Sequence, residues 1–191
     1  ITPTSLPMNE AIEFWAGKTP LSQSDLDAAV KASHGRAFVI GGIADADILQ
    51  RVYDEIGRSI KDGVDFREFR KSLASVWEKA GFTGGKAYRI ENIFRTNMQS
   101  AYAAGRYKQM MRVAARRPYW QYVAVGDTRT RPSHMAMNGR VFRSDDKIWN
   151  TWYPPNGYMC RCKVRSLSDR QVKKRGIEVE KGTKVIQTPD P

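Results

Sequence analysis

The two cysteines of this chain, Cys160 and Cys162, lie one residue apart, and His134 precedes them in the same stretch. Thiolate sulfur and imidazole nitrogen are ligands that zinc prefers in proteins. These three side chains could therefore bind one zinc ion, with Asp127 or water as the fourth ligand, although Cys-x-Cys matches zinc sites less well than Cys-x2-Cys does. The alternative is that both thiols pack as small hydrophobic groups and that the imidazole bonds a backbone carbonyl.

The same stretch also suggests two kinds of catalysis. A cysteine, His134 and Asp127 could act as nucleophile, base and orienting group. His134 with Arg129 and Arg131 could instead form the cluster with which small RNases cleave phosphodiesters, so an RNase-type phosphodiesterase is an alternative function. The sequence has no paired carboxylates and no second histidine near these residues, so we expect a protein that is not an enzyme.

Positive charge is concentrated in the C-terminal part of the chain. Residues 1–85 carry 10 Lys and Arg against 12 Asp and Glu, whereas residues 86–191 carry 22 against 8. Such a surplus attracts polyanions, so DNA or an acidic protein surface is a candidate partner, and a basic nucleic-acid-binding module is a further alternative. No apolar run reaches the roughly 18 residues of a membrane span. Free thiols suit a reducing interior, so we expect synthesis in the cytoplasm. We expect no membrane partner and no small-molecule substrate.

Prolines and a helix cap indicate the first elements of the chain. Residues 1–20 contain three prolines and a short apolar patch, which predicts an extended arm. Ser22 and Asp25 are spaced as a capping box for a short helix that ends at Gly35. Residues 37–40 predict a strand or a buried turn.

Hydrophobic spacing predicts the helices that follow. Apolar residues recur at three and four over residues 45–60, and a second helix begins at Asp65 and ends near Gly81, so the two form an antiparallel hairpin. Residues 86–117 predict the longest helix, which Pro118 would end.

The long helix has two distinct faces. Small residues over 100–105 would let another backbone come close, which makes this helix central to the fold. Asn97 lies on the same face, and we expect it to bond a neighbouring loop. The opposite face carries the candidates for nucleic-acid binding, which are Arg106, Lys108, Arg112, Arg116 and Arg117.

After the long helix the pattern changes to short strands. Short strands are predicted at residues 119–125, 140–142 and 162–165, and the first of these alternates between buried and exposed positions. Residues 132–137 predict one or two helical turns that end at Asn138 and Gly139. The fold class is therefore α+β: an N-terminal arm and helical hairpin, a long central helix, and a small antiparallel sheet in a loop-rich C-terminal half.

One set of spaced residues runs through most of the C-terminal half: Asn97, Ala101-Tyr102, Gly105-Arg106, Tyr122-Val-Ala-Val-Gly-Asp127, Arg129, Arg131-Pro-Ser-His134, Asn138-Gly139, Trp149, Pro154-Pro-Asn-Gly157 and Cys160-Arg-Cys162. This set resembles the head morphogenesis domain of phage Mu protein F-like minor head proteins, over roughly residues 88–167. The resemblance divides the chain into an N-terminal arm and helical region (1–85), the head morphogenesis domain (86–168) and a C-terminal tail (169–191). It implies structural roles for Asn97, Asp127, Arg129, Gly139, Trp149, Gly157 and Arg161.

The resemblance also implies a function. It is that of a minor capsid protein of a tailed phage or prophage, which acts in prohead assembly near the portal and resides in the phage head of the virion. The implied partners are the portal and the major capsid or scaffolding proteins, together with packaged DNA. Many relatives carry Cys-x2-Cys and His-x2-Cys-Arg-Cys, a set suited to zinc. Alignment on Asp127 and Gly139 places Arg131 and His134 at the first two cysteines and Gly157 at that histidine.

Overall fold

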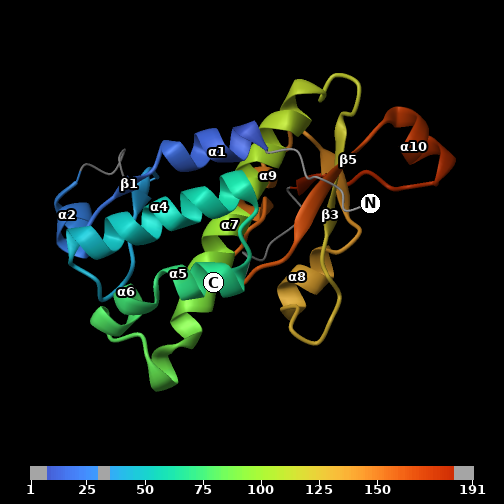
Figure 1. Ribbon diagram of the computed structural model, residues 1–191. Coiled ribbons are helices and arrows are strands. Elements are labelled where there is room, and N and C mark those ends of the chain that lie inside the picture. The colour runs from blue at the N-terminus through green and yellow to red at the C-terminus, as the bar shows by residue number, and fades with distance from the viewer. Residues whose placement is uncertain (1–7, 30–34, 183–191) are drawn as a thin grey trace, which may run out of the picture. The chain divides into compact units, whose positions relative to one another are not determined.

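The computed structural model describes residues 8–29 and 35–182, and the chain divides into two units, residues 1–105 and 106–191. Each unit has a hydrophobic core of its own. Figure 1 shows the helices and strands along the chain. The start of the predicted arm, the residues just before Gly35 and the end of the predicted tail lie outside the described residues. The domain boundaries inferred from the sequence remain a prediction.

The first unit is built mainly from helices. A parallel pair of two-residue strands, β1 and β2, joins its N-terminal elements. The 3-10 turn η1 (Gly84–Lys86) precedes the long helix α7, whose last turns belong to the second unit. In chain order, the elements before η1 and α7 itself are α1 (Asn9–Ala16), β1 (Thr19–Pro20), α2 (Gln23–Ala28), β2 (Ala37–Phe38), α4 (Ala46–Asp62), α5 (Phe66–Ser72), α6 (Ala74–Lys79) and α7 (Tyr88–Arg112).

Helix α4 confirms the predicted first arm of the hairpin. The carboxylate of Asp45 accepts hydrogen bonds from the first backbone amides of the helix, and Gly63 ends it in the left-handed conformation with φ 73°. Val52 and Ile56 are fully buried on the inner face. The second predicted helix is divided into α5 and α6 at Leu73. Just before this point, the hydroxyl of Ser72 donates to the carbonyl of Phe69. Such side-chain bonds compete with the backbone hydrogen bonds of a helix.

The N-terminal segment differs from the predicted extended arm. Residues 9–16 form α1, and its side chains Ala11 and Trp15 are buried in the core of the first unit. The two residues are four apart and so share one helical face. Trp15 Nε1 donates to the carbonyl of Tyr53, while the Tyr53 hydroxyl donates to the carbonyl of Trp15, each at 3.1 Å. The prediction of an extended arm is therefore wrong for this part, because long-range burial fixes it.

The long helix α7 is shorter at its end than predicted. It stops at Arg112 rather than next to Pro118, and the following residues continue as turns in which Val113 and Ala114 donate three residues back. The prediction that a second backbone approaches its small residues is confirmed. A β-carbon on Gly105 would lie 2.9 Å from the backbone nitrogen of Ala11.

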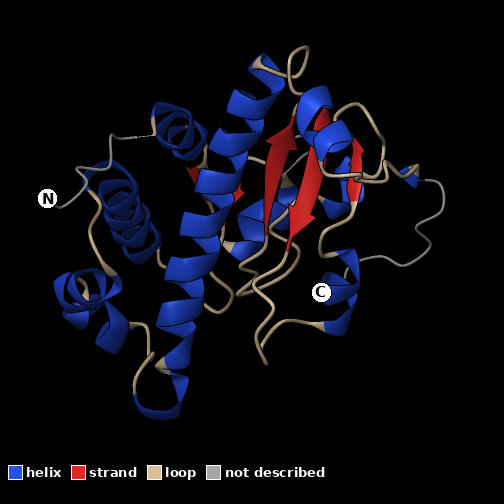
Figure 2. Ribbon diagram, turned by 90° about the vertical axis from the view of Figure 1, so that its right-hand side faces the viewer, coloured by secondary structure: helices blue, strands red, loops and turns tan. Residues whose placement is uncertain are grey.

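The second unit holds an antiparallel three-stranded sheet, and Figure 2 shows its strands side by side. The strand order is β4-β3-β5, so β3 pairs with both neighbours. The predicted strands and the predicted helix that carries His134 are confirmed, with shifts of a few residues at the strand ends. The elements are β3 (Tyr119–Val123), α8 (Pro132–Met137), β4 (Val141–Arg143), α9 (Trp149–Trp152), β5 (Lys163–Leu167) and α10 (Asp169–Lys174).

Alternation along the strands separates two faces of this sheet. Trp120, Tyr122 and Phe142 point into the larger core, whose other members include two tryptophans of α9. Val141 and Leu167 face the opposite side and pack with α10. The structure thus has the predicted α+β class.

Two features of the C-terminal part were not predicted, namely helices α9 and α10. The sequence analysis also gives a C-terminal tail over residues 169–191, and the described part of this segment packs on the sheet. Glu180 accepts from the guanidinium of Arg140 at 2.9 Å, and its backbone amide donates to Val141. A long-range ion pair therefore holds the described part of the tail.

We expect Gly105→Ala to destabilise the first unit. The added methyl group would overlap the backbone of α1, and overpacking costs about 1–3 kcal/mol. That cost exceeds the gain of about 1 kcal/mol that alanine brings to a helix. Chemical denaturation measures the difference, with Gly85→Ala as the control, because nothing lies within 4 Å of its β-carbon position. Equal stability of Gly105→Ala and wild type would contradict the close approach of α1.

Candidate metal centre

Three buried side chains with metal-binding atoms meet in the second unit: His134, Cys160 and Cys162. His134 belongs to α8, which begins at Pro132, a position where a helix needs no amide hydrogen. Both cysteines lie in the loop that leads into β5. The fold therefore brings together, from two separate segments, the three residues that the sequence offers as zinc ligands.

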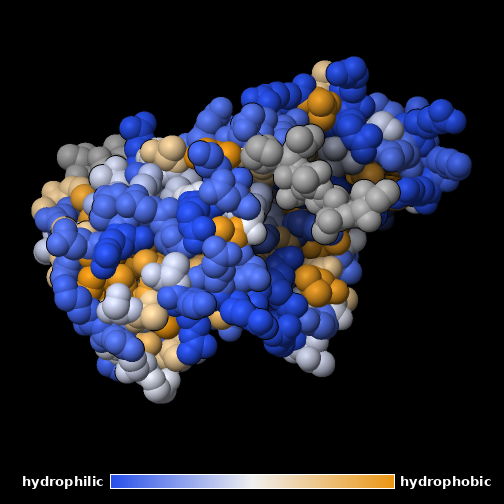
Figure 3. All heavy atoms as spheres, viewed as in Figure 1, coloured by the Kyte–Doolittle hydropathy of each residue, from blue (hydrophilic) through white to orange (hydrophobic). Residues whose placement is uncertain are grey.

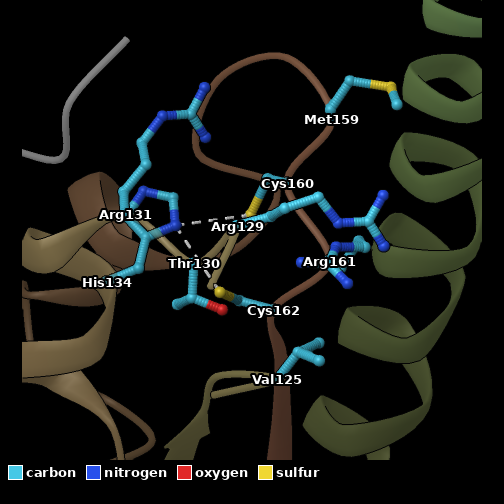
Figure 4. Close-up of a pocket in the computed structure, with 9 residues that line it drawn as sticks. All are labelled: Val125, Arg129, Thr130, Arg131, His134, Met159, Cys160, Arg161 and Cys162. Carbon is cyan, nitrogen blue, oxygen red and sulfur yellow. Dashed lines mark hydrogen bonds between the residues drawn. The ribbon is translucent and has the colours of Figure 1, made fainter. Parts of the chain in front are cut away.

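The distances within this set suit a tetrahedral metal. Nδ1 of His134 lies 3.5 Å from Sγ of Cys162 and 3.8 Å from Sγ of Cys160, and the three atoms lie within 4.8 Å of one another. Ordinary zinc bond lengths and tetrahedral angles separate nitrogen from sulfur by about 3.6 Å. Figure 4 shows the imidazole pointing at both sulfur atoms. The donor set and its geometry fit zinc.

The set supplies three ligands, and a small cavity lies beside it. Its lining includes all three ligands together with Thr130 and Met159, and it has room for about one water molecule. Within the described ranges, no further His, Cys, Asp or Glu joins the group. Water or another group that enters this cavity could complete a four-coordinate site, as in zinc sites with three protein ligands.

The surroundings of His134 bear on the alternative without a metal. The imidazole is 2% exposed, and its Nε2 atom has no hydrogen-bond partner among the residues that the structure describes. The expected bond to a backbone carbonyl is therefore not formed by that atom, while Nδ1 faces sulfur. Nδ1 lies within hydrogen-bond distance of both thiols, an orientation that a metal ligand would also have.

The two thiols influence each other. A hydrogen bond from Cys162 lowers the pKa of Cys160, while the same bond and burial raise the pKa of Cys162. The two pKa values move in opposite directions, so the pair favours sharing one proton. A thiolate is the form in which cysteine binds a metal.

Asp127 lies beside this set but is not part of it. Its two carboxylate oxygens accept hydrogen bonds from Arg161 at 2.6 and 2.7 Å, and they also accept from Thr130 and from the backbone of Arg129. The bond from Arg161 holds the pKa of Asp127 well below its usual range. Because Arg161 separates the two cysteines, this pair fastens the Cys-x-Cys segment to the loop that precedes α8.

Of the catalytic arrangements that the sequence suggests, the structure brings together His134 and the two cysteines but not Asp127. Asp127 binds Arg161 instead of orienting the imidazole, and His134 is buried rather than presented to a substrate. Arg129 is exposed, and its Nε lies 3.9 Å from the Asp127 carboxylate. Arg131 donates to the carbonyl of Tyr158 at 3.0 Å. The arginines therefore surround the cavity rather than forming a reaction centre with His134.

The other predicted structural residues have separate roles. Trp149 is buried and its Nε1 donates to the carbonyl of Arg143 at 2.8 Å. Gly139 and Gly157 adopt positive φ angles of 85° and 79°. Asn97, in the first unit, donates to the carbonyl of Ile93 at 2.8 Å, so this bond stays within α7 rather than reaching a loop.

The basic residues proposed for nucleic acid are divided by the structure. Arg117 is half-buried and donates to Ser166 and Gln171, so it supports the sheet. The remaining four are exposed, namely Arg106, Lys108, Arg112 and Arg116. Among the described helices, none has the length and apolar character that crossing a membrane would require.

Two residues beside the centre, Tyr122 and Asn156, belong to the spaced set, but the sequence gave neither of them a role of its own. Asn156 is buried and donates to the carbonyl of Trp152 at 3.1 Å and to the hydroxyl of Tyr122 at 3.4 Å. Burial raises the pKa of that hydroxyl, so it stays protonated. The turn-forming run of residues 154–157 was the one available hint, and it did not indicate which side chain faces inward.

The family model described as "Phage Mu protein F like protein" matches residues 50–165, a range that contains the three candidate ligands. No solved structure matches the chain.

Two relatives agree with this match. The chain is 36% identical to the putative capsid assembly protein F of Escherichia phage Mu, over 96% of this chain and 45% of the relative. It is 38% identical to the Mu-like prophage FluMu F protein of Haemophilus influenzae, over 78% of this chain and 39% of the relative. The chain thus spans less than half the length of these relatives. It belongs to the Phage Mu protein F-like family.

We expect Asp127→Asn to lower the melting temperature at pH 7, since it removes the charge that Arg161 binds. The native pKa of Asp127 is depressed, so its stabilising contribution is present above the unfolded pKa of about 4 and is lost as pH falls. The difference between variant and wild type should therefore shrink below that pH. Scanning calorimetry over a pH series measures it.

Asp145→Asn is the matched control, because Asp145 also pairs with an arginine, at 2.9 Å, but only two residues away on the surface. Such local exposed pairs contribute little. If both substitutions lowered the melting temperature equally, the pairing of Asp127 with Arg161 would have no special role in the fold.

Proposed function

We propose that this chain is part of a minor capsid protein that acts in prohead assembly near the portal of a tailed phage or prophage. The observation that carries the proposal is the family match over residues 50–165, which includes elements of both units. A relative from phage Mu is named as a putative capsid assembly protein. The position near the portal rests on the resemblance to minor head proteins.

Charge supports a contact with a polyanion in the assembled head. The first unit carries 13 Lys and Arg against 13 Asp and Glu, whereas the second carries 19 against 7. The whole net charge of +12 therefore belongs to the second unit. Packaged DNA is one such polyanion, and the exposed side chains Arg106 and Arg116 could contact its phosphates.

Quantitative mass spectrometry of purified proheads tests this proposal. We expect peptides of the full-length protein in proheads, in far fewer copies than the major capsid protein. The portal and major capsid proteins serve as internal standards. Finding the protein free in the lysate but absent from proheads would overturn the proposal.

We also propose that His134, Cys160 and Cys162 hold one zinc ion with a structural role. Their burial, their convergence and the orientation of the imidazole support it. The ion would join α8 to the loop before β5, two segments that Asp127 and Arg161 also connect. Zinc sites of this kind contribute directly to folding.

We expect purified protein to contain about one zinc ion per chain by elemental analysis. Cys160→Ser and His134→Ala should each lower zinc affinity by more than the roughly 10–100-fold that loss of an outer-shell partner costs. A chelator should lower the melting temperature of the wild type but not of these variants. Met135→Ala, an exposed change on the same helix, is the control. Metal-free protein whose stability does not respond to zinc would refute the site.

A further inference from the structure

The surface around the cavity exposes several large hydrophobic side chains. Val125 is 52% exposed, Met135 46%, Tyr158 67% and Met159 40%. Isolated apolar residues on a surface are common, but a group of this kind marks an interaction site. We call these four residues, together with Arg129 and Arg131, the arginine-rimmed patch.

The members of the patch are neighbours. Val125, Met159 and both arginines line the same cavity, and Arg131 donates to the carbonyl of Tyr158. A β-carbon on Gly126, next to Val125, would lie 4.0 Å from the methyl carbon of Met135.

Figures 3 and 4 agree with this grouping. Figure 3 shows hydrophobic atoms at the position of α8 with hydrophilic atoms around them. Figure 4 shows Met159 and Val125 on the side of the cavity toward which Arg129 and Arg161 extend. The members of the patch therefore gather around one cavity of the second unit.

The charge of the patch is positive and incompletely compensated. Three arginines and no carboxylate line the cavity. Asp127 is the nearby acid, and both of its oxygens are engaged by Arg161. Arg129 reaches that carboxylate only at 3.9 Å, and its side chain is 76% exposed. The patch thus presents guanidinium groups beside apolar side chains, and its complement is acidic and apolar.

We propose that the arginine-rimmed patch binds an acidic segment of another head protein, one that carries Asp or Glu beside apolar side chains. This inference rests on the proposed role in head assembly and names the surface and the partner chemistry for it. Arginine matches carboxylates with paired hydrogen bonds, and Met and Tyr are enriched with Arg in protein interfaces. The apolar side chains would supply the desolvated centre and the arginines the specificity.

Nucleic acid is the competing occupant, and the composition of the patch argues against it. Phosphate contacts come from basic and polar side chains and gain little from exposed Val or Met. Arg106 and Arg116 are exposed basic residues outside this patch, and they remain the candidates for DNA binding. A protein segment therefore accounts for both the apolar and the charged members of the patch.

Incorporation of variants into proheads tests the proposal, with copies counted by mass spectrometry. We expect Arg129→Glu to reduce incorporation by at least about tenfold, as loss of a central interface charge does. Arg170→Glu makes the same change at an exposed arginine of α10 and is the matched control, expected to leave incorporation unchanged. A combined Met135→Ser and Met159→Ser variant alters no charge and should also reduce incorporation. Unchanged melting temperatures must accompany these results; a variant that unfolds is replaced by Arg129→Gln.

The outcomes separate this inference from the function on which it rests. If wild-type protein were absent from proheads, the proposed function would fail and the inference with it. If wild type were present but Arg129→Glu and Arg170→Glu behaved alike, the patch would be refuted while the function stood. Loss with Arg129→Glu but not with the methionine changes would indicate a polyanion such as DNA and overturn the protein partner.

Photo-crosslinking identifies the occupant directly. A photoreactive methionine analogue at Met159, in proheads assembled with full-length protein, should join to a peptide rich in Asp or Glu. Arg129→Glu should abolish the crosslink, and Arg170→Glu should not. Crosslinks to DNA, or to a peptide without acidic residues, would contradict the proposal.

Discussion

The bond between Asp127 and Arg161 joins two loops that are far apart in the sequence. The placement of the two cysteines beside α8 depends on this connection. Asp127 follows β3, while Arg161 lies between the two cysteines before β5. Two charged hydrogen bonds in a paired geometry fix both distance and orientation, which a single bond would not. Both cysteines are therefore held at the level of α8, and His134 can reach them.

The aromatic core beneath these loops makes that arrangement possible. Trp120, Tyr122 and Trp152 fill the space between the sheet and α9, and the ring of His134 lies edge-on to Trp152 at 6.3 Å. The histidine and the thiols are thus removed from water, and the hydrophobic shell around a metal site controls the access of solvent to it. Burial therefore serves the candidate centre.

The two proposals for this region are linked by geometry. Arg129 and Arg131 lie in the loop that leads into the helix of His134, and Met159 lies in the loop of the two cysteines. An ion that joined these loops from within would also fix the patch in one conformation, and a preformed surface loses less entropy on binding. The same loop arrangement would then both hold the candidate metal centre and present the arginine-rimmed patch to a partner. The first unit carries no net charge, so electrostatic attraction to an acidic partner would come from the second unit.

The sequence by itself determined the elements whose signals are local. Spacing of Val52 and Ile56, the cap at Asp45 and the start of α8 at Pro132 require only neighbours within a few residues. Tertiary structure alone decided that residues 9–16 fold as a buried helix, that Asp127 pairs with Arg161 rather than with His134, and that α10 covers one face of the sheet. These outcomes depend on partners that lie tens of residues away, and a local pattern does not encode which of several possible partners packing brings within reach.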